Sequence, residues 1–182
     1  MLQNIGSELF LISEYILDCK RYYRDFVEIT WQDSDLRKWL NEDFYNTAFT
    51  AVEQSRIKTT HCSDNGEGTP DTEDRIFLLS AAELIALTEL HGKDLRRAIG
   101  TPFAKAKKAD GCRLYVYDKS VDANYLLADG QRHGCSWWWL RTRLGEPSRA
   151  AFVGTQASIR SYARVNRTGY GVRPALRLRL GE

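Results

Sequence analysis

Apolar residues follow one another or alternate with polar residues in short runs along much of the chain. Runs of about four to eight residues with this pattern are typical of β-strands. The sequence therefore predicts a modest sheet built from short strands. The predicted strands are Glu8–Ser13 and Glu14–Asp18, as one strand or two, then Arg75–Leu79, Arg113–Tyr117, Trp137–Leu140 and Val172–Leu180.

The last two predicted strands have patterns of their own. In Trp137–Leu140, alternation places Trp138 on the side opposite to its two neighbours. We expect all three tryptophans to belong to the core, because large aromatic side chains are more often buried than displayed. In Val172–Leu180, apolar residues alternate with arginine and alanine, as in a terminal strand with two unlike faces. Pro174 has no backbone N–H, so we expect imperfect pairing near the start of this strand.

A helical pattern begins at Ser34. Its hydroxyl can cap the first turn, and Asp35 suits the positive end of the helix dipole. The apolar positions then follow helical spacing, so we expect this helix to lie across the sheet. The predicted apolar face consists of Leu36, Trp39, Leu40, Phe44 and Ala48.

Two further helices are indicated by capping signals. Ser80–Glu83 has the spacing of a capping box, which predicts a helix to about Leu90 that Gly92 stops. Thr101 is followed by proline at the first helical position, which predicts a short helix through Lys108.

The segments between these elements are predicted as loops. Cys19–Thr30 and Val121–Gly134 have mixed composition, and Val52–Thr60 is predicted as a turn or short strand. His61–Asp74 is polar, acidic and contains glycine, so we expect it to bury nothing. The carboxylates between Asp64 and Asp74 offer oxygens to calcium, but their spacing is not that of an EF-hand loop, and a solvated loop is the simpler interpretation.

Together these elements predict an α+β fold, with short helices around a small, mostly antiparallel sheet and long C-terminal loops. A chain of 182 residues that is 43% hydrophobic is long enough for one well-cored domain, residues 1–182. No apolar run reaches the roughly 18 residues of a membrane span, and Met1–Ile12 lacks the basic start of a signal peptide. We expect no membrane insertion, and cell surface, virion and cytoplasm stay open as locations.

The net charge of +2 is unevenly distributed. Residues 1–119 contain 16 basic and 20 acidic side chains, whereas residues 120–182 contain 10 basic and 4 acidic ones, and all ten basic residues there are arginines. A basic surface suggests nucleic acid or another polyanion. No base-stacking motif accompanies the charge, so a solvated strand face is the simpler interpretation.

Residues that commonly carry catalysis or metal binding are scattered. The four cysteines show no CxxC spacing, which argues against a zinc site, although a bridge between Cys112 and Cys135 stays open. The three histidines lack the spacing of a facial triad. His133 and Cys135 are two residues apart, but no third group orients them as a nucleophile pair. We therefore expect no catalytic residue, no metal and no cofactor.

Two aromatic and apolar segments, Trp137–Arg141 and Gly171–Leu176, enclose a run of unusual composition. With other motifs they resemble a bacterial and phage domain family of otherwise unknown function, which is similar to the formylglycine-generating-enzyme-like branch of the C-type lectin fold. The resemblance covers nearly the whole chain. Its further motifs are Ile12–Lys20, Trp31, Leu36–Asn41, Asp43–Phe49 and Phe77–Ser80.

The resemblance implies a C-type-lectin-like scaffold over residues 1–136, followed by a variable cassette and closing strand over residues 137–180. The family includes variable proteins of diversity-generating retroelements, in which mutation at template adenines rewrites such a cassette. Randomised Asn codons that end in a pyrimidine never encode Lys, Glu, Gln, Met or Trp. Residues 142–170 contain none of these except Glu146 and Gln156. This composition fits variation at some positions between residues that stay unchanged. We call the unchanged residues the frame and predict that they are Ala150, Ala151, Val153 and Val165.

The implied function is recognition of a macromolecular ligand, a protein or a surface glycan, without catalysis. Tyr, Arg, Ser and Gly between the frame residues are the residue types that paratopes use. A polyanion binder is the alternative, and a formylglycine-generating-type metalloenzyme is disfavoured because no Cys follows Cys135 to complete a copper pair. The predicted anchors are Phe152, Arg160, Tyr162, Arg164, Arg167 and Tyr170. The full candidate set adds Arg143, Arg149, Gly154, Thr155, Ser158, Ser161, Asn166 and Thr168.

Overall fold

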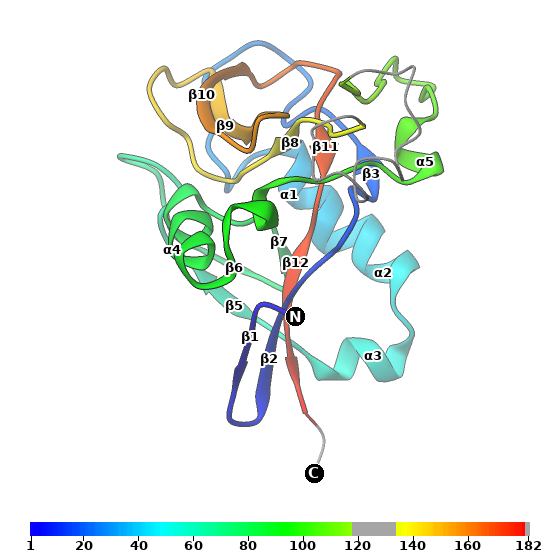
Figure 1. Ribbon diagram of the computed structural model, residues 1–182, viewed down its shortest axis with the longest axis vertical. Coiled ribbons are helices and arrows are strands. Elements are labelled where there is room, and N and C mark those ends of the chain that lie inside the picture. The colour runs from blue at the N-terminus through cyan, green and yellow to red at the C-terminus, as the bar shows by residue number, and fades with distance from the viewer. Residues whose placement is uncertain (118–133, 181–182) are drawn as a thin grey trace.

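A computed structural model describes residues 1–117 and 134–180, and these residues form a mixed α+β fold of short helices and small sheets. This confirms the predicted fold class. The described strands pair antiparallel except for β8 with β11 and a few isolated bridges. In Figure 1, β12 runs down the middle of the molecule, the sheet that contains β9 and β10 lies at one end, and α4 lies on one side of β12 with α2 and α3 on the other.

The first sheet has the strand order β1–β2–β12–β4, with β7 also pairing with β12. The C-terminal β12 therefore lies between strands from the first half of the chain. The buried strand predicted at residues 75–79 is shorter than predicted: β7 covers Ile76–Phe77, and the buried Leu78 and Leu79 follow it outside the strand. The strands are β1 (Gln3–Ile5), β2 (Glu8–Ile12), β4 (Ile57–Lys58), β7 (Ile76–Phe77) and β12 (Ala175–Arg179).

The second sheet has the order β10–β9–β8–β11–β3. The predicted terminal strand is split, because its first part, β11, joins this sheet and its second part, β12, joins the other. The break falls at Pro174, whose missing N–H explains it. The strands are β3 (Asp18–Cys19), β8 (Trp138–Trp139), β9 (Arg149–Val153), β10 (Ile159–Arg164) and β11 (Gly171–Val172).

The helix predicted from Ser34 forms, but its apolar face shifts by one residue. It comprises α1 (Asp35–Trp39), a π-helical turn η1 (Leu40–Phe44) and α2 (Tyr45–Ala48), and Ser34 caps α1. A π-turn holds one extra residue, so the next buried position after Leu40 is Tyr45. Phe44, as predicted, and Phe49 are half-buried and pack against the core. Ala48 is exposed, and its predicted place on the buried face is wrong.

The two helices predicted from capping signals are confirmed at their starts. α4 (Ala81–His91) begins with the complete Ser80–Glu83 capping box and ends at Gly92. α5 (Pro102–Lys105) is capped by Thr101 but is shorter than predicted. It stops because the Lys108 amide donates to Cys112 O (2.8 Å) and not to the helix. A 3₁₀ turn, η2 (Lys93–Arg96), follows α4.

Three local predictions are wrong in whole or in part. Val52–Thr60 begins with a helix, α3 (Ala51–Arg56), which Thr50 and Glu53 cap reciprocally, and only its second part contains the predicted short strand, β4. His61–Asp74 contains a hairpin, β5 (Thr60–Cys62) with β6 (Thr72–Asp74), and Asp74 is buried where it accepts hydrogen bonds from Trp31, Arg37 and Thr72. Arg113–Tyr117 is extended but forms only an isolated bridge at Val116. The predicted loop Val121–Gly134 lies almost entirely outside the described residues.

The main core is an apolar cluster that joins both large sheets, and Ile99 and Cys135 form a small second cluster. Trp138 and Trp139 are fully buried on opposite sides of β8, as their alternation predicts. Trp138 donates to Arg96 O (3.0 Å), whereas Trp139 donates to Lys20 O (2.9 Å) and stacks on Tyr170. In the part of the chain that the structure describes, no helix has the length and apolar character needed to cross a membrane.

Candidate functional site

The segment predicted as a variable cassette is a β-hairpin, not a long loop. β9 and β10 pair antiparallel, and a tight turn closes them where the Gly154 amide donates to Ser158 O (2.8 Å). The residues that we predicted as a fixed frame are all buried, together with Ala157 and Ala163. Those four frame residues are Ala150, Ala151, Val153 and Val165.

A β-bulge in β10 changes which side chains face solvent. Between the pairs Arg160–Phe152 and Ala163–Ala150, β10 advances by three residues while β9 advances by two. An extra residue of this kind interrupts the alternation of side chains. Arg160, Ser161 and Tyr162 are consequently all exposed, as is Arg164 beyond the buried Ala163.

Two pockets lie on this part of the molecule. A small pocket of about 230 Å³ is lined by seven candidates, by Trp137 and by Gln156. The half-buried Trp137 thus belongs to the site as well as to the core, where we had placed it. The seven candidates are Phe152, Gly154, Thr155, Ser158, Arg160, Tyr162 and Tyr170.

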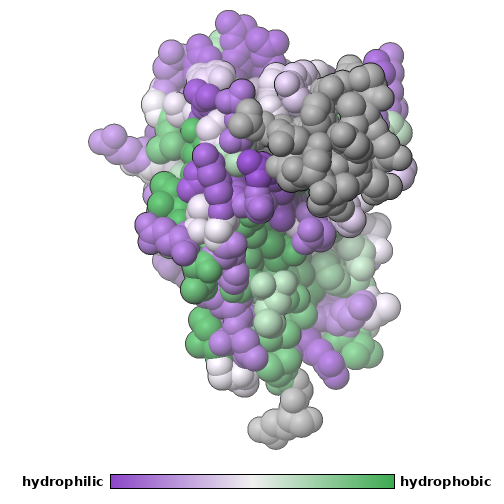
Figure 2. All heavy atoms as spheres, in the orientation of Figure 1, coloured by the Kyte–Doolittle hydropathy of each residue, from purple (hydrophilic) through white to green (hydrophobic). Residues whose placement is uncertain are grey.

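A large pocket of about 620 Å³ shares Trp137, Tyr162 and Tyr170 with the small one. We call the side chains that line the two pockets the C-terminal face. Figure 2 shows mainly hydrophilic residues at the end of the molecule that carries β9 and β10, and hydrophobic residues lower down near β2 and β12. The candidates in the large pocket are Arg149, Tyr162, Arg164, Arg167, Thr168 and Tyr170.

Phe152 and Tyr170 are buried, with only 3% and 6% of their surface exposed, so their predicted role as exposed anchors is wrong. Tyr170 stacks on Trp139 (4.2 Å between ring centroids) and meets Phe152 edge-on (5.0 Å). Burial raises the pKa of Tyr170 to about 12, partly opposed by the charge of Arg167. These rings form the floor of the pockets because their faces pack against the core.

The arginines of the C-terminal face differ in how far they are engaged. Arg149 donates to Glu146 Oε2 and to Tyr162 O (both 2.8 Å), and the Arg164 guanidinium lies 4.7 Å from the Phe26 ring centroid. Arg160 donates to Ser158 Oγ (3.0 Å). In the described structure, Arg167 makes no side-chain hydrogen bond or ion pair and is exposed.

Three candidates do not line either pocket. Arg143 pairs with Glu28 (3.2 Å) and donates to Glu67 O (3.0 Å), which ties the segment after β8 to the hairpin of β5 and β6. Ser161 is exposed beside the pockets, and Asn166 is half-buried. Arg143 is therefore a structural contact between distant segments, whereas Ser161 remains available at the surface.

Sequence analysis missed Arg113 and Tyr115, which line the large pocket from outside the cassette. Their backbone amides donate to Thr168 O and Gly169 O (both 2.9 Å), so this extended segment lies beside the end of the cassette. The alternation of Arg113 and Tyr115 with the apolar Leu114 was visible in the sequence. The sequence did not indicate that Arg113 and Tyr115 would lie on the same surface as the cassette.

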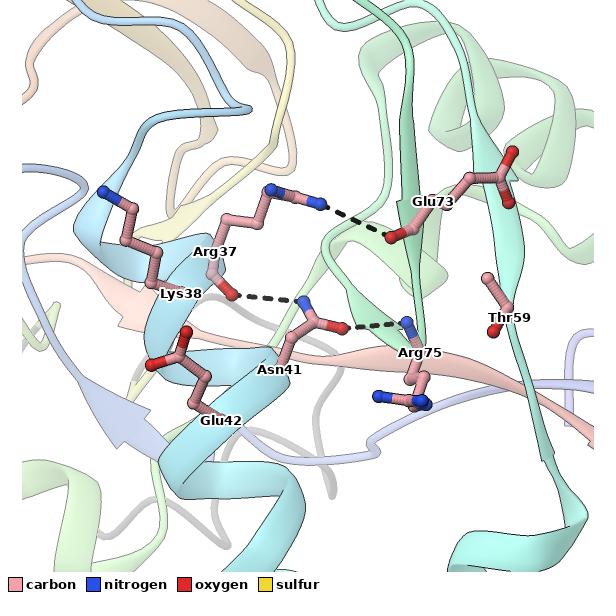
Figure 3. Close-up of a pocket in the computed structure, with 7 residues that line it drawn as sticks. All are labelled: Arg37, Lys38, Asn41, Glu42, Thr59, Glu73 and Arg75. Carbon is pink, nitrogen blue, oxygen red and sulfur yellow. Dashed lines mark hydrogen bonds between the residues drawn. The ribbon is translucent and has the colours of Figure 1, made fainter.

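A third pocket, of about 390 Å³, lies between the α1–η1 helix and β6 (Figure 3). Asn41 joins its two walls, accepting from the Arg75 amide (2.8 Å) and donating to Arg37 O (3.1 Å). Arg37 also donates to Glu73 O (3.4 Å). Three cations and two carboxylates line this pocket. Its polar groups hold the helix against the hairpin, so the C-terminal face is the stronger candidate site.

Cysteine and metal chemistry do not converge on the C-terminal face. All four cysteines are buried and none is in a disulfide bond, so the Cys112–Cys135 bridge that the sequence left open is not formed. A hydrogen bond with Cys112, together with burial, raises the pKa of Cys19. Over residues 1–117 and 134–180, no three His, Cys, Asp or Glu side chains lie together as metal ligands. His133, the suggested partner of Cys135, lies outside these residues.

Comparison with known proteins identifies the family. A family model described as "Domain of unknown function (DUF6273)" matches residues 6–180. The chain belongs to this family. No curated protein and no solved structure matches.

Proposed function

We propose that this DUF6273 domain is a non-catalytic ligand-binding protein that recognises a protein or a surface glycan through its C-terminal face. The bulge of β10 supports this proposal, because it exposes Arg160, Ser161 and Tyr162 in succession above a buried frame. Exposed Tyr provides rigid contact area at low entropic cost, and exposed Arg provides forked hydrogen-bond donors. A surface of this kind accepts new side chains without rebuilding the fold.

We infer further that the scaffold is C-type-lectin-like and that a retroelement rewrote the cassette. The support is the division within residues 142–170 between buried small frame residues and exposed polar ones. The neighbouring DNA tests this directly. We expect a near-copy of the cassette that differs mainly at adenines, close to a reverse transcriptase gene. A genome that carries this chain without either feature would refute the retroelement origin and leave ligand binding to be judged separately.

Randomisation of the surface tests ligand binding. In a displayed library with random residues at Arg160, Ser161, Tyr162, Arg164 and Arg167, we expect most members to stay protease-resistant, because exposed substitutions usually change stability little. Selection against arbitrary purified proteins, such as lysozyme and streptavidin, should yield binders.

A matched library randomises the buried frame instead and should lose protease resistance in most members, because core positions tolerate little change of volume. Its positions are Ala150, Ala151, Val153, Ala163 and Val165. If the surface library unfolds as often as the frame library, or yields no binder, the proposal is wrong.

Polyanion binding is the second candidate, and its support is the excess of arginine after residue 120. These arginines do not form one open patch. Arg141 and Arg173 are buried, and Arg143 and Arg149 pair with carboxylates. Titration of labelled oligo(dT) at increasing salt distinguishes this candidate, because phosphate contacts give a steep loss of affinity with salt. Tight, salt-dependent binding there would favour it over protein recognition.

A further inference from the structure

The large pocket is positively charged. Arg113, Arg149, Arg164 and Arg167 all line it, and no Asp or Glu appears among its described lining residues. A concave surface with one sign of charge attracts the opposite sign more strongly than a flat surface does. The pocket therefore suits an anionic group.

Two of these arginines have no partner within the described structure. Arg149 is held by Glu146, and Arg164 lies over Phe26, whereas Arg113 and Arg167 make no side-chain hydrogen bond or ion pair with a described residue. A guanidinium group has five N–H donors in a planar fork that matches a carboxylate. Arg113 and Arg167 are thus the least engaged of the four arginines. The Arg164 guanidinium also makes no hydrogen bond with a described residue, but it stacks on the Phe26 ring.

The backbone fixes both arginines on neighbouring segments. The Arg113 amide donates to Thr168 O (2.9 Å), one residue after Arg167. The Arg167 amide donates to Arg164 O (3.0 Å), which closes a turn. A fixed backbone costs less entropy on binding than a loose loop does, so only the two side chains remain to be ordered by a ligand.

The floor of the large pocket offers apolar contact, because its inner rings, Trp137 and Tyr170, are covered by other rings. Among its described lining residues, only Tyr115 and Tyr162, which are 36% and 58% exposed, show open ring surface there. Trp137 stacks on Tyr115 (3.8 Å between ring centroids) and lies against Tyr170 (5.2 Å). Tyr170 is itself covered by Trp139. Nucleic-acid sites that lack base-edge contacts rely on open aromatic faces for stacking. An apolar or aromatic side chain between carboxylates fits this floor better than a run of stacked bases.

We infer that the large pocket binds an acidic segment of a partner protein, with carboxylates on Arg113 and Arg167 and an apolar side chain against Tyr115 and Trp137. This inference rests on the proposed function, since it names the ligand class of the same face. Arg113 and Tyr115 precede the cassette, so they form a constant half of the site. Versions of the domain with different cassettes should keep the contact of a ligand carboxylate with Arg113, whereas the contact at position 167 should vary with the cassette.

A random peptide library displayed on phage and selected on the full chain tests the inference. We expect the enriched peptides to share at least a pair of Asp or Glu residues around an apolar one. Binding of a synthetic enriched peptide, measured by fluorescence anisotropy, should weaken about tenfold or more in the double variant Arg113→Ala, Arg167→Ala, because both charge-assisted contacts are lost.

The matched control is Lys38→Ala, Arg75→Ala, which removes the same charge from exposed residues of the third pocket. Its affinity should change by less than about twofold, since long-range charge effects are screened. Asn and Gln replacements in the peptide provide a second test that leaves the protein intact, and they should weaken binding to the same extent as the arginine variants.

Each alternative result has a definite meaning. Enriched peptides without acidic residues that still need Arg160 and Tyr162 would overturn the acidic ligand and leave the proposed function standing. Enriched peptides that bind independently of the C-terminal face, or no enrichment at all, would overturn both. Stronger competition by oligo(dT) or heparin than by the peptide would replace the acidic protein segment with a polyanion.

Discussion

Arg141 connects distant parts of the chain through one buried side chain that is only 1% exposed. It donates to Asn65 Oδ1 (2.9 Å), to Leu78 O and Ser63 O (both 2.7 Å) and to Glu83 (2.5 Å). Burial acts to lower the pKa of Arg141, but the hydrogen bond and charge of Glu83 outweigh it and raise the pKa. The guanidinium therefore stays charged and holds β8 against α4 and the turn after β5.

Replacement of this residue should be costly. We expect Arg141→Met to lower the free energy of unfolding by about 3–5 kcal/mol, because it leaves buried acceptors without donors. Arg149→Met, which breaks a more exposed pair with Glu146, should cost no more than about 1 kcal/mol. Urea unfolding of both variants measures the difference. Equal losses would show that the buried network contributes nothing beyond a surface ion pair.

At the scale of elements, two helices begin with the same reciprocal cap in different surroundings. In α4, Ser80 is fully buried, and Glu83 serves both the cap and the ion pair with Arg141. In α3, Thr50 and Glu53 are exposed, and no residue of that helix is buried. The cap of α4 is therefore part of the core, whereas the cap of α3 supports only its own helix.

This contrast predicts unequal effects from one kind of change. We expect Ser80→Ala to lower the free energy of unfolding by about 1–2 kcal/mol and Thr50→Ala by about 0.5 kcal/mol, the high and low ends of measured cap effects. Thermal unfolding followed by circular dichroism compares them. A greater loss for Thr50→Ala would contradict the assignment of α4 to the core.

At the scale of the whole molecule, recognition and stability are separate at the surface but meet in the pocket floor. The aromatic rings form a continuous path from buried Trp31 through Tyr22, Trp139 and Tyr170 to Phe152. Tyr162, the next ring, is 58% exposed and meets Phe152 edge-on. The C-terminal face is thus the outer end of the core, and only its exposed layer can vary freely.

We therefore expect two tyrosines of the cassette to behave differently. Tyr170→Ala should lower the free energy of unfolding by about 3–5 kcal/mol, as for other large buried rings, whereas Tyr162→Ala should cost less than about 1 kcal/mol. Tyr170→Phe keeps the stacked ring and serves as the matched control, with a loss well below that of the alanine variant. Denaturant unfolding measures all three. Similar losses for both alanine variants would disprove the two-layer description.

The sequence by itself determined those features that depend on residues close together in the chain. The caps at Ser34, Ser80 and Thr101 formed as predicted, because each hydrogen bond joins residues three apart. The capping box at Thr50 was equally legible and was missed. The break at Pro174 followed from its missing backbone N–H. The opposite faces of Trp138 and Trp139 followed from the two-residue period of a strand.

Only the tertiary structure decided the features that depend on contacts between distant residues. The π-turn at Leu40–Phe44 moved the buried face to Tyr45, and the bulge in β10 exposed Tyr162, because each inserts a residue into a local period. Burial of Tyr170 and the approach of Arg113 to the cassette arise from packing across the chain. A periodic pattern indicates which side chains share a face of an element. It does not indicate which distant segment packs beside that face, and here the packing of distant segments formed the C-terminal face.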